Sequence, residues 1–393
     1  MDSKARIKLD KLKSSEAQQN IEKKPRSGKD ASVELLRIIG CIMVIGVHVN
    51  QGIMYFDKAS DTGILITCLV GDGVAIFWMI MGFYLFKSDY KKLLKKSVRH
   101  ILIPMFAYTI FMMLFGKYLA GATPGILDGF RETMSNFKTY ITDGLLRWRN
   151  VIEYCGQFWY LYTYMLVVLI YPALKGIEST FKTKKCCIIG GAAIFGLLFV
   201  NDLTNNKFMH LSHDPVISTF AASFVILMGY LIYRWKDKFE GRKLIGILGL
   251  VGFFMVNVLR AFVEHKVWYR NPGDNHPVFW YTTFGVLSVY SLIIFSFGFA
   301  DVWNKDKVKA VINHFGGLTM GIYFIHPLVI GFMKNHGIAG KLDAHLSNNA
   351  LSIARYQLSQ MVLAFIASLI IIEIFTLVKK LILNLYQKSK VEK

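Results

Sequence analysis

The chain of 393 residues is 54% hydrophobic and only 18% charged, whereas a soluble domain usually carries about 25% charged residues. This composition argues against an ordinary soluble enzyme, and the 14% of aromatic residues excludes an intrinsically disordered chain. In so apolar a chain, the net charge of +20 indicates loops that face anionic lipid, so membrane lipids and not nucleic acid are the expected partners. The five cysteines form no CxxC pair, and neither a metal site nor a disulfide framework is predicted.

Apolar runs long enough to cross a bilayer, which takes about 20 residues, recur along the chain. Ten candidate spans lie at 33–54, 64–86, 101–119, 158–174, 186–200, 216–233, 244–263, 278–300, 315–332 and 357–378. The ninth run is rich in glycine and contains His326-Pro327, so it can bend. The sequence predicts an all-α, polytopic helix bundle in the cell membrane. Its parts are a basic tail at 1–32, a membrane domain at 33–380 and a short tail at 381–393.

Basic residues set the predicted orientation of this bundle. If the N-terminus is cytoplasmic, most of the 46 Lys and Arg residues fall on the cytoplasmic side, and the alternation never breaks. Both ends are therefore predicted to be cytoplasmic. The outer segments 201–215 and 264–277 are rich in Asn, His, Asp and aromatic residues. Such groups suit sugar hydroxyls and ring faces, although ordinary outer loops have the same composition.

The first span contains two ionisable residues, Arg37 and His48, which are eleven positions apart. This spacing is about three helical turns, so both lie on nearly one face, roughly 16 Å apart along the axis. Taken singly, Arg37 could snorkel toward head groups or pair with Glu34, and His48 could hydrogen-bond to a neighbouring helix. Because they share a face, a functional interpretation is favoured. A cation at the inner surface suits donor phosphates, and an outer imidazole can accept a hydroxyl proton.

Two further signals lie in the second span and the basic segment after it. Gly71, Gly73 and Gly82 permit close approach between helices. Lys96 and Arg99 are spaced i,i+3 on one helical face, at the same predicted membrane surface as Arg37. An ordinary cytoplasmic loop explains such a pair when it is taken alone, but opposite Arg37 it could complete a phosphate pocket.

In combination, these motifs resemble those of the acyltransferase family 3 integral membrane proteins. The matching segments are Arg37-x10-His48, Gly73-Val74-x-x-Phe77-Trp78-x-x-Met81-Gly82-Phe83, Lys96-x-x-Arg99, Phe158-Trp159-Tyr160-Leu161 and Tyr323-x-x-His326-Pro327. Trp78, Met81 and Lys96 stand where the family pattern has Phe, Ser and Arg.

The resemblance implies transfer of an acyl group, usually acetyl, from cytosolic acyl-CoA across the membrane. The acceptor would be a hydroxyl of a cell-surface glycan or of its lipid-linked precursor. Arg37, Lys96 and Arg99 would hold the phosphates of CoA. His48 would deprotonate the hydroxyl or carry the acyl group briefly itself, and both routes remain open. Acyl-CoA enters as a substrate, and no bound cofactor is expected.

The remaining candidates are acceptor-binding or structural: Trp159, Tyr160, Glu153, Tyr323 and His326. Glu373 in the tenth span is expected to pair with a basic group inside the bundle. Two alternatives without acyl transfer are a polysaccharide transporter or flippase and a glycan polymerase. A transporter often shows internal repeats, and none is found between the two halves, which weakly favours the enzyme.

Overall fold

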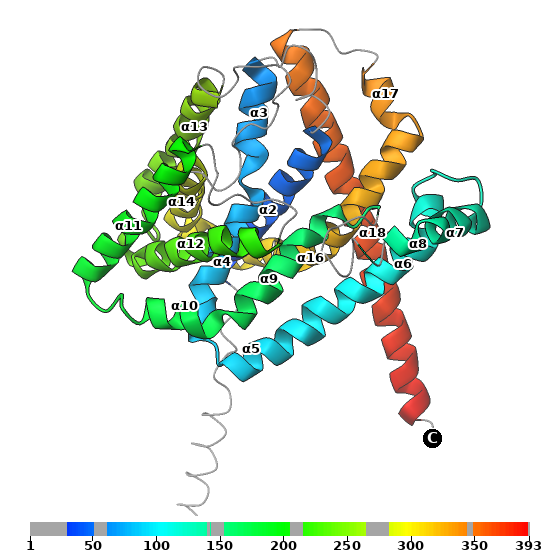
Figure 1. Cartoon of the computed structure of the whole chain (residues 1–393), viewed down its shortest axis with the longest axis horizontal. Coiled ribbons are helices and arrows are strands. Elements are labelled where there is room, and N and C mark those ends of the chain that lie inside the picture. Colours follow the sequence, from blue (N-terminus) through cyan, green and yellow to red (C-terminus); the bar gives the residue numbers. More distant parts are fainter. Residues whose placement is uncertain are drawn as a thin grey trace, which may run out of the picture.

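The computed structural model describes residues 30–50, 61–139, 142, 153–204, 215–264, 283–343 and 349–391. Within these ranges every regular element is helical, which confirms the predicted fold class (Figure 1). The first part of the chain forms α2 (Ala31–Asn50), α3 (Asp61–Gly71), α4 (Gly73–Tyr84), α5 (Tyr90–Ser97), α6 (Ile103–Leu119) and α7 (Ile126–Ser135). The middle forms α9 (Trp159–Leu169), α10 (Tyr171–Glu178), α11 (Lys184–Leu203), α12 (Pro215–Arg234) and α13 (Lys243–Val263). The last part forms α14 (Thr283–Gly298), α16 (Asp306–Asn335), α17 (Ile338–Asp343) and α18 (Ala350–Val391).

Short helical pieces connect several of these helices. They are η2 (Leu85–Lys87), the π-helical η3 (Val98–Leu102), α8 (Phe137–Thr139), η5 (Gly156–Phe158), η6 (Lys236–Lys238) and α15 (Ala300–Trp303). The piece η3 joins α5 to α6, so that residues 90–119 form one long apolar helix. The Asp89 side chain caps the start of this helix by accepting a 3.0 Å hydrogen bond from the backbone N–H of Lys92.

Eight helices of the described chain are long and apolar enough to cross a membrane. A ninth span is formed if η5, α9 and α10 are taken as one bent unit, and α14 is a shorter apolar helix. Each of the ten predicted apolar runs therefore corresponds to a described helix, although residues 51–54 of the first run and 278–282 of the eighth lie outside the described ranges. The protein is a multi-pass membrane protein.

The sharp bend lies in the fourth apolar run, and the ninth run is not broken. The helices α9 and α10 meet at an angle of 65° where Pro172 occupies the first turn of α10. Proline is well suited to a first turn because its missing N–H has no helical partner there. In contrast, α16 passes through Pro327 as one continuous helix of 30 residues. Neighbouring helices make such a proline tolerable inside a membrane helix.

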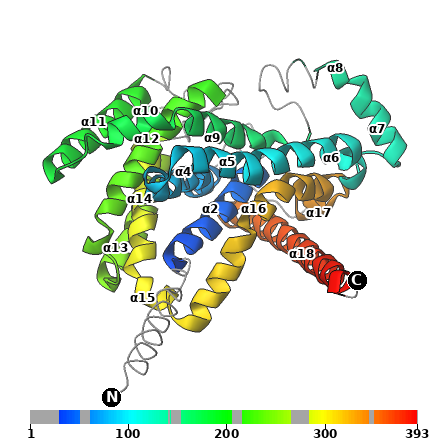
Figure 2. The ribbon, with the colours of Figure 1, turned by 90° about the horizontal axis from the view of Figure 1, so that it is seen from below.

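The helix α2 lies at the centre of the bundle, packed against α3, α4, α14, α16 and α18 (Figure 2). Two glycines of the second span allow the close crossings that the sequence predicts. A methyl group placed on Gly73 would lie 2.7 Å from the carbonyl oxygen of Gly40 in α2, and one on Gly82 would lie 2.1 Å from that of Ile226 in α12. Any larger residue at either position would separate these helices. This packing fixes α2, and with it Arg37 and His48, relative to the other spans.

Candidate active site

The imidazole rings of His48 and His326 are in contact inside the bundle. His48 is near the end of α2, and His326 belongs to α16, which packs alongside α2. The ring centroids are 5.1 Å apart and the ring planes are tilted by 47°. His326 is fully buried, and His48 is partly exposed. The sequence did not predict this contact, which joins two residues far apart in the chain.

His326 is hydrogen-bonded on only one side of its ring. Its Nδ1 lies 3.2 Å from the backbone carbonyl oxygen of Ile322, one turn earlier in α16. Its Nε2 is buried and has no hydrogen-bond partner among the described residues. A buried nitrogen of this kind is unusual because polar atoms removed from water are nearly always paired.

Aromatic rings extend this contact toward the middle of the bundle. The ring of Tyr323 lies 6.0 Å from that of His326, and Tyr160 of α9 packs edge-on against Tyr323 at 5.9 Å. Tyr160 also packs against the fully buried Trp78 of α4 at 4.4 Å. Trp159 packs edge-on against Tyr160 from the neighbouring position in α9. The structure thus brings together residues from four of the predicted motifs.

Gln157 fixes the Tyr323 side of this aromatic group. The Tyr323 hydroxyl donates a hydrogen bond to the backbone carbonyl of Gln157, and the Gln157 side-chain amide donates to the carbonyl of Phe324 at 3.2 Å. Both bonds join η5 to α16. They hold Tyr323, and the turn that carries His326, in a fixed position relative to α9.

At the other end of α2, Arg37 forms an ion pair. Its Nη1 lies 2.8 Å from Oε1 of Glu34, which is the i,i+3 pairing considered from the sequence. The Glu34 side chain is 5% exposed and that of Arg37 is 36% exposed, so the guanidinium reaches the surface of the bundle. Within the described residues this is the one ion pair that Arg37 forms. Its other N–H donors are therefore available for an anion.

Lys96 and Arg99 lie near the beginning of the third span and are both exposed. Lys96 is in the last turn of α5, and Arg99 lies in the π-helical turn η3. Between them, Ser97 is buried, and its hydroxyl is 3.0 Å from that of Tyr164. Among the described residues, no hydrogen bond or ion pair joins either cation to Arg37. A shared phosphate site with Arg37 therefore stays a prediction.

Comparison with known families identifies the class of protein. A family model described as an acyltransferase domain, that of acyltransferase family 3, matches residues 30–377. The chain belongs to this family. The protein is therefore a membrane acyltransferase. No curated protein and no solved structure matches the chain.

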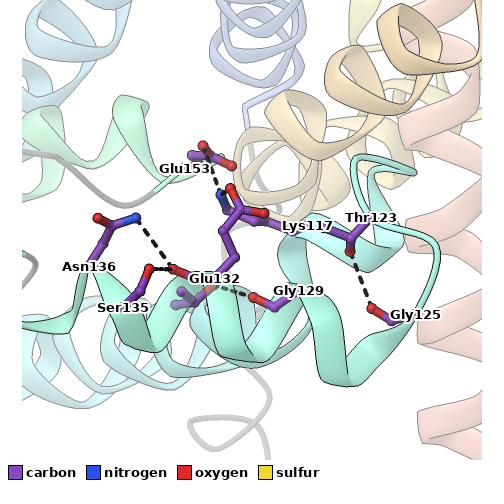
Figure 3. Close-up of polar contacts among 9 residues, drawn as sticks. Lys117, Thr123, Gly125, Gly129, Glu132, Ser135, Asn136 and Glu153 are labelled. Atoms are coloured by element: carbon purple, nitrogen blue, oxygen red, sulfur yellow. Dashed lines mark hydrogen bonds and ion pairs between the residues drawn. The ribbon is translucent and has the colours of Figure 1, made fainter.

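In this acyltransferase, Glu153 takes part in a group of ion pairs around Lys117 (Figure 3). The Lys117 ammonium, on the last turn of α6, lies 3.5 Å from Glu153 Oε1 and also bonds Glu132 of α7. The lysine side chain is 9% exposed, and both carboxylates are about half exposed. Neither ion pair involves a histidine. This geometry ties α7 to the segment before η5, and an acceptor-binding role for Glu153 stays a prediction.

Glu373 pairs with a histidine, but at the surface of the bundle and not inside it as the sequence predicts, because the His314 side chain is 52% exposed and that of Glu373 29% exposed. Its carboxylate in α18 accepts a hydrogen bond from Nε2 of His314 in α16. The pair joins α16 to α18 within the acyltransferase, away from the ring contact of His326 and His48.

Sequence reasoning missed a second pair of ionisable residues inside the acyltransferase. Arg260 of α13 lies 3.0 Å from both carboxylate oxygens of Asp72, which sits between α3 and α4. Both side chains are 1% exposed. Glu264, also buried, lies 4.0 Å from the Arg260 Nε. The signal was present, because each of the apolar runs 64–86 and 244–263 contains a single ionisable residue.

Most of the two outer segments expected to contact glycan, 201–215 and 264–277, is not covered by the structure, because residues 205–214 and 265–282 lie outside the described ranges. In the part of the chain that is described, no three His, Cys, Asp or Glu side chains converge in a way that could hold a metal ion.

Proposed function

We propose that the protein transfers an acyl group, with acetyl as the first candidate, from cytosolic acyl-CoA to a hydroxyl group. The acceptor would be a cell-surface glycan or its lipid-linked precursor, and the protein would act in the plasma membrane. Family membership supports acyl transfer and favours it over the transporter and polymerase alternatives. The observation that carries the proposal is the contact between His48 and His326 inside the helix bundle.

The donor would bind at the Arg37 end of α2. CoA carries several phosphate groups, and an arginine with available donors at the bundle surface suits them. Lys96 and Arg99, exposed on the third span, would supply further positive charge. The pantetheine arm would then follow α2 toward His48, over the roughly 16 Å that separate the two residues along the helix.

At His48 the reaction needs a base. The acceptor oxygen would attack the thioester carbonyl carbon and form the ester bond, while the carbon–sulfur bond breaks. His48 would take the hydroxyl proton and return it to the thiolate of CoA, so the histidine ends the cycle as it began. Transfer through an acyl-histidine remains an alternative route, and it would use the same residue as nucleophile.

The decisive experiment compares the wild-type protein with His48→Ala in lipid nanodiscs. Release of CoA from acetyl-CoA would be followed by chromatography, and acetylation of surface glycans in the host cell by mass spectrometry. His48→Ala is expected to lower the transfer rate about 10²–10⁴-fold, as is typical when a general base is lost.

The matched control is His336→Ala. His336 is an exposed histidine at the end of α16 that stacks on Phe332, and its substitution is expected to leave transfer unchanged. Transfer by His48→Ala within a few-fold of the wild-type rate would remove His48 as the reacting group. Wild-type protein that neither binds nor consumes acyl-CoA would refute the proposed function as a whole.

A further inference from the structure

The hydrogen bond of His326 determines where the proton of its ring lies. A backbone carbonyl oxygen can only accept, so the bond to the Ile322 carbonyl requires a hydrogen on Nδ1. In the neutral ring, the lone pair must be on Nε2.

The surroundings of His326 favour this neutral form. The side chain is fully buried, and a second hydrogen on Nε2 would be a buried donor with no acceptor. The ring of Tyr323 also lies near, but its hydroxyl already donates to the Gln157 carbonyl. Among the described rings in contact with His326, His48 is therefore the one that can offer an N–H to the Nε2 lone pair.

We infer that His326 is a positioning residue for His48. On the proposed function, from which this inference follows, the Nε2 lone pair of His326 accepts the N–H of His48 in the reacting complex. His48 is then held in one tautomer, with its second nitrogen unprotonated and directed at the acceptor hydroxyl. A carboxylate or carbonyl behind a reacting histidine commonly does this work. Here a neutral imidazole does it, without burying a negative charge.

The two rings are in contact but not yet hydrogen-bonded. Their centroid distance of 5.1 Å and tilt of 47° leave a rotation of the partly exposed His48 ring to complete the bond. Catalytic hydrogen bonds are often long or poorly aligned before substrate binds, and they tighten in the substrate complex. During the reaction, His48 takes the acceptor proton, carries two N–H groups and keeps one of them on His326. His48 then gives the acceptor proton to the thiolate of CoA, and the two histidines end the cycle in the protonation states in which they began.

Two isosteric substitutions separate this role from a purely structural one. In His326→Asn, the side-chain amide can occupy the place of Nδ1 and keep the bond to the Ile322 carbonyl, but nothing replaces Nε2. In His326→Gln, the amide oxygen can reach the place of Nε2 and accept the N–H of His48. We expect kcat to fall roughly hundredfold in the Asn variant and less than about tenfold in the Gln variant, with the KM for acetyl-CoA unchanged in both.

A structural role predicts the reverse order, because the Asn variant keeps the bond within α16. An Asn variant as active as the Gln variant, or more active, would overturn the inference. The tautomer is tested without turnover by ¹⁵N nuclear magnetic resonance of histidine-labelled wild-type protein. The His326 signals are assigned by their loss in the Asn variant, or in a Leu variant if the Asn variant does not fold.

A hydrogen on Nδ1 of His326 is the expected result, and a hydrogen on Nε2 alone would overturn the inference even if the enzyme is fully active. Wild-type protein that consumes no acyl-CoA would instead refute the proposed function. The two failures can be distinguished, because the tautomer measurement does not depend on turnover.

Discussion

Two pairs of ionisable residues lie within the helix bundle, and they are bonded in opposite ways. Asp72 and Arg260 are joined by two hydrogen bonds of 3.0 Å, and both side chains are 1% exposed. His48 and His326 touch through their rings, and the Nε2 of His326 is buried without a hydrogen-bond partner. In the Asp72–Arg260 pair, each charge is neutralised by the other. In the His48–His326 pair, the Nε2 of His326 receives no hydrogen bond from the described residues.

On the proposed function, this difference separates a structural pair from a reactive one. A buried guanidinium stays charged, so the folded protein is stable only if a carboxylate partner is held next to that charge. An imidazole can be buried in the neutral form and keep an acceptor nitrogen for a later partner. The ion pair joins α13 to the junction of α3 and α4, which packs on α2 at Gly73. We therefore expect that changes in the ion pair affect folding first, and that changes in the histidines affect the reaction first.

The largest effect on stability is expected for Asp72→Ala. This substitution leaves Arg260 buried without its bidentate partner, which should lower the free energy of unfolding by about 3–5 kcal/mol. Glu264, 4.0 Å from Arg260 Nε, can offset a part of this loss. Thermal unfolding of purified protein in detergent, followed by tryptophan fluorescence, measures the change.

The matched control for that substitution is the triple variant Asp72→Leu, Arg260→Met and Glu264→Gln. It removes all three buried charges, so it should recover most of the lost stability. A loss below about 1 kcal/mol in the single variant would contradict a structural role for the pair.

The membrane spans could be predicted because each depends only on residues that are neighbours in the sequence. Each needs a run of apolar residues, and the runs at 33–54 and 357–378 can be recognised without knowing their neighbours. The close crossing at Gly73 was equally accessible, since a small residue marks a possible approach. The sequence predicted that the ninth run can bend at Pro327, but the sharp break lies in the fourth run, because tertiary packing decides which proline breaks a membrane helix.

The active-site geometry was only partly predictable. Both histidines are evident in the sequence, but their contact depends on the packing of α16 against α2. No pattern within either helix predicts which helices will pack together. Arg260 and Asp72 were missed for a different reason. The rule that singled out Arg37 and His48, an ionisable residue within an apolar run, applies equally to them.

An intermediate effect is expected for Arg37→Ala, measured on donor binding. A charge-assisted contact to phosphate contributes roughly 1.5–3 kcal/mol, so its loss should weaken CoA affinity about ten- to a hundredfold. Calorimetric titration with CoA and with 3′-dephospho-CoA measures the loss and shows which phosphate is held. Because the substitution also leaves Glu34 without its ion pair, the same titration is made with Arg37→Gln combined with Glu34→Gln.

Lys91→Ala serves as the control for that titration, since Lys91 is another exposed cation, on α5. It should bind CoA as the wild-type protein does. Equal weakening by the Lys91 and Arg37 substitutions would indicate a diffuse attraction to positive charge and would remove Arg37 as a specific ligand.

His326→Leu is expected to have the smallest effect on stability, although its effect on the reaction should be large. Leucine removes the unpaired Nε2 and the bond from Nδ1 together, so no buried polar atom of this side chain is left unsatisfied. Replacing an incompletely bonded polar side chain by an apolar one of similar size is often nearly neutral. We therefore expect the free energy of unfolding to change by less than about 1 kcal/mol, in either direction, while acyl transfer falls as in the Asn variant. Unfolding in detergent measures the first quantity and CoA release the second. A loss of stability as large as that of Asp72→Ala would make His326 a packing residue, and the contrast between the two buried pairs would then disappear.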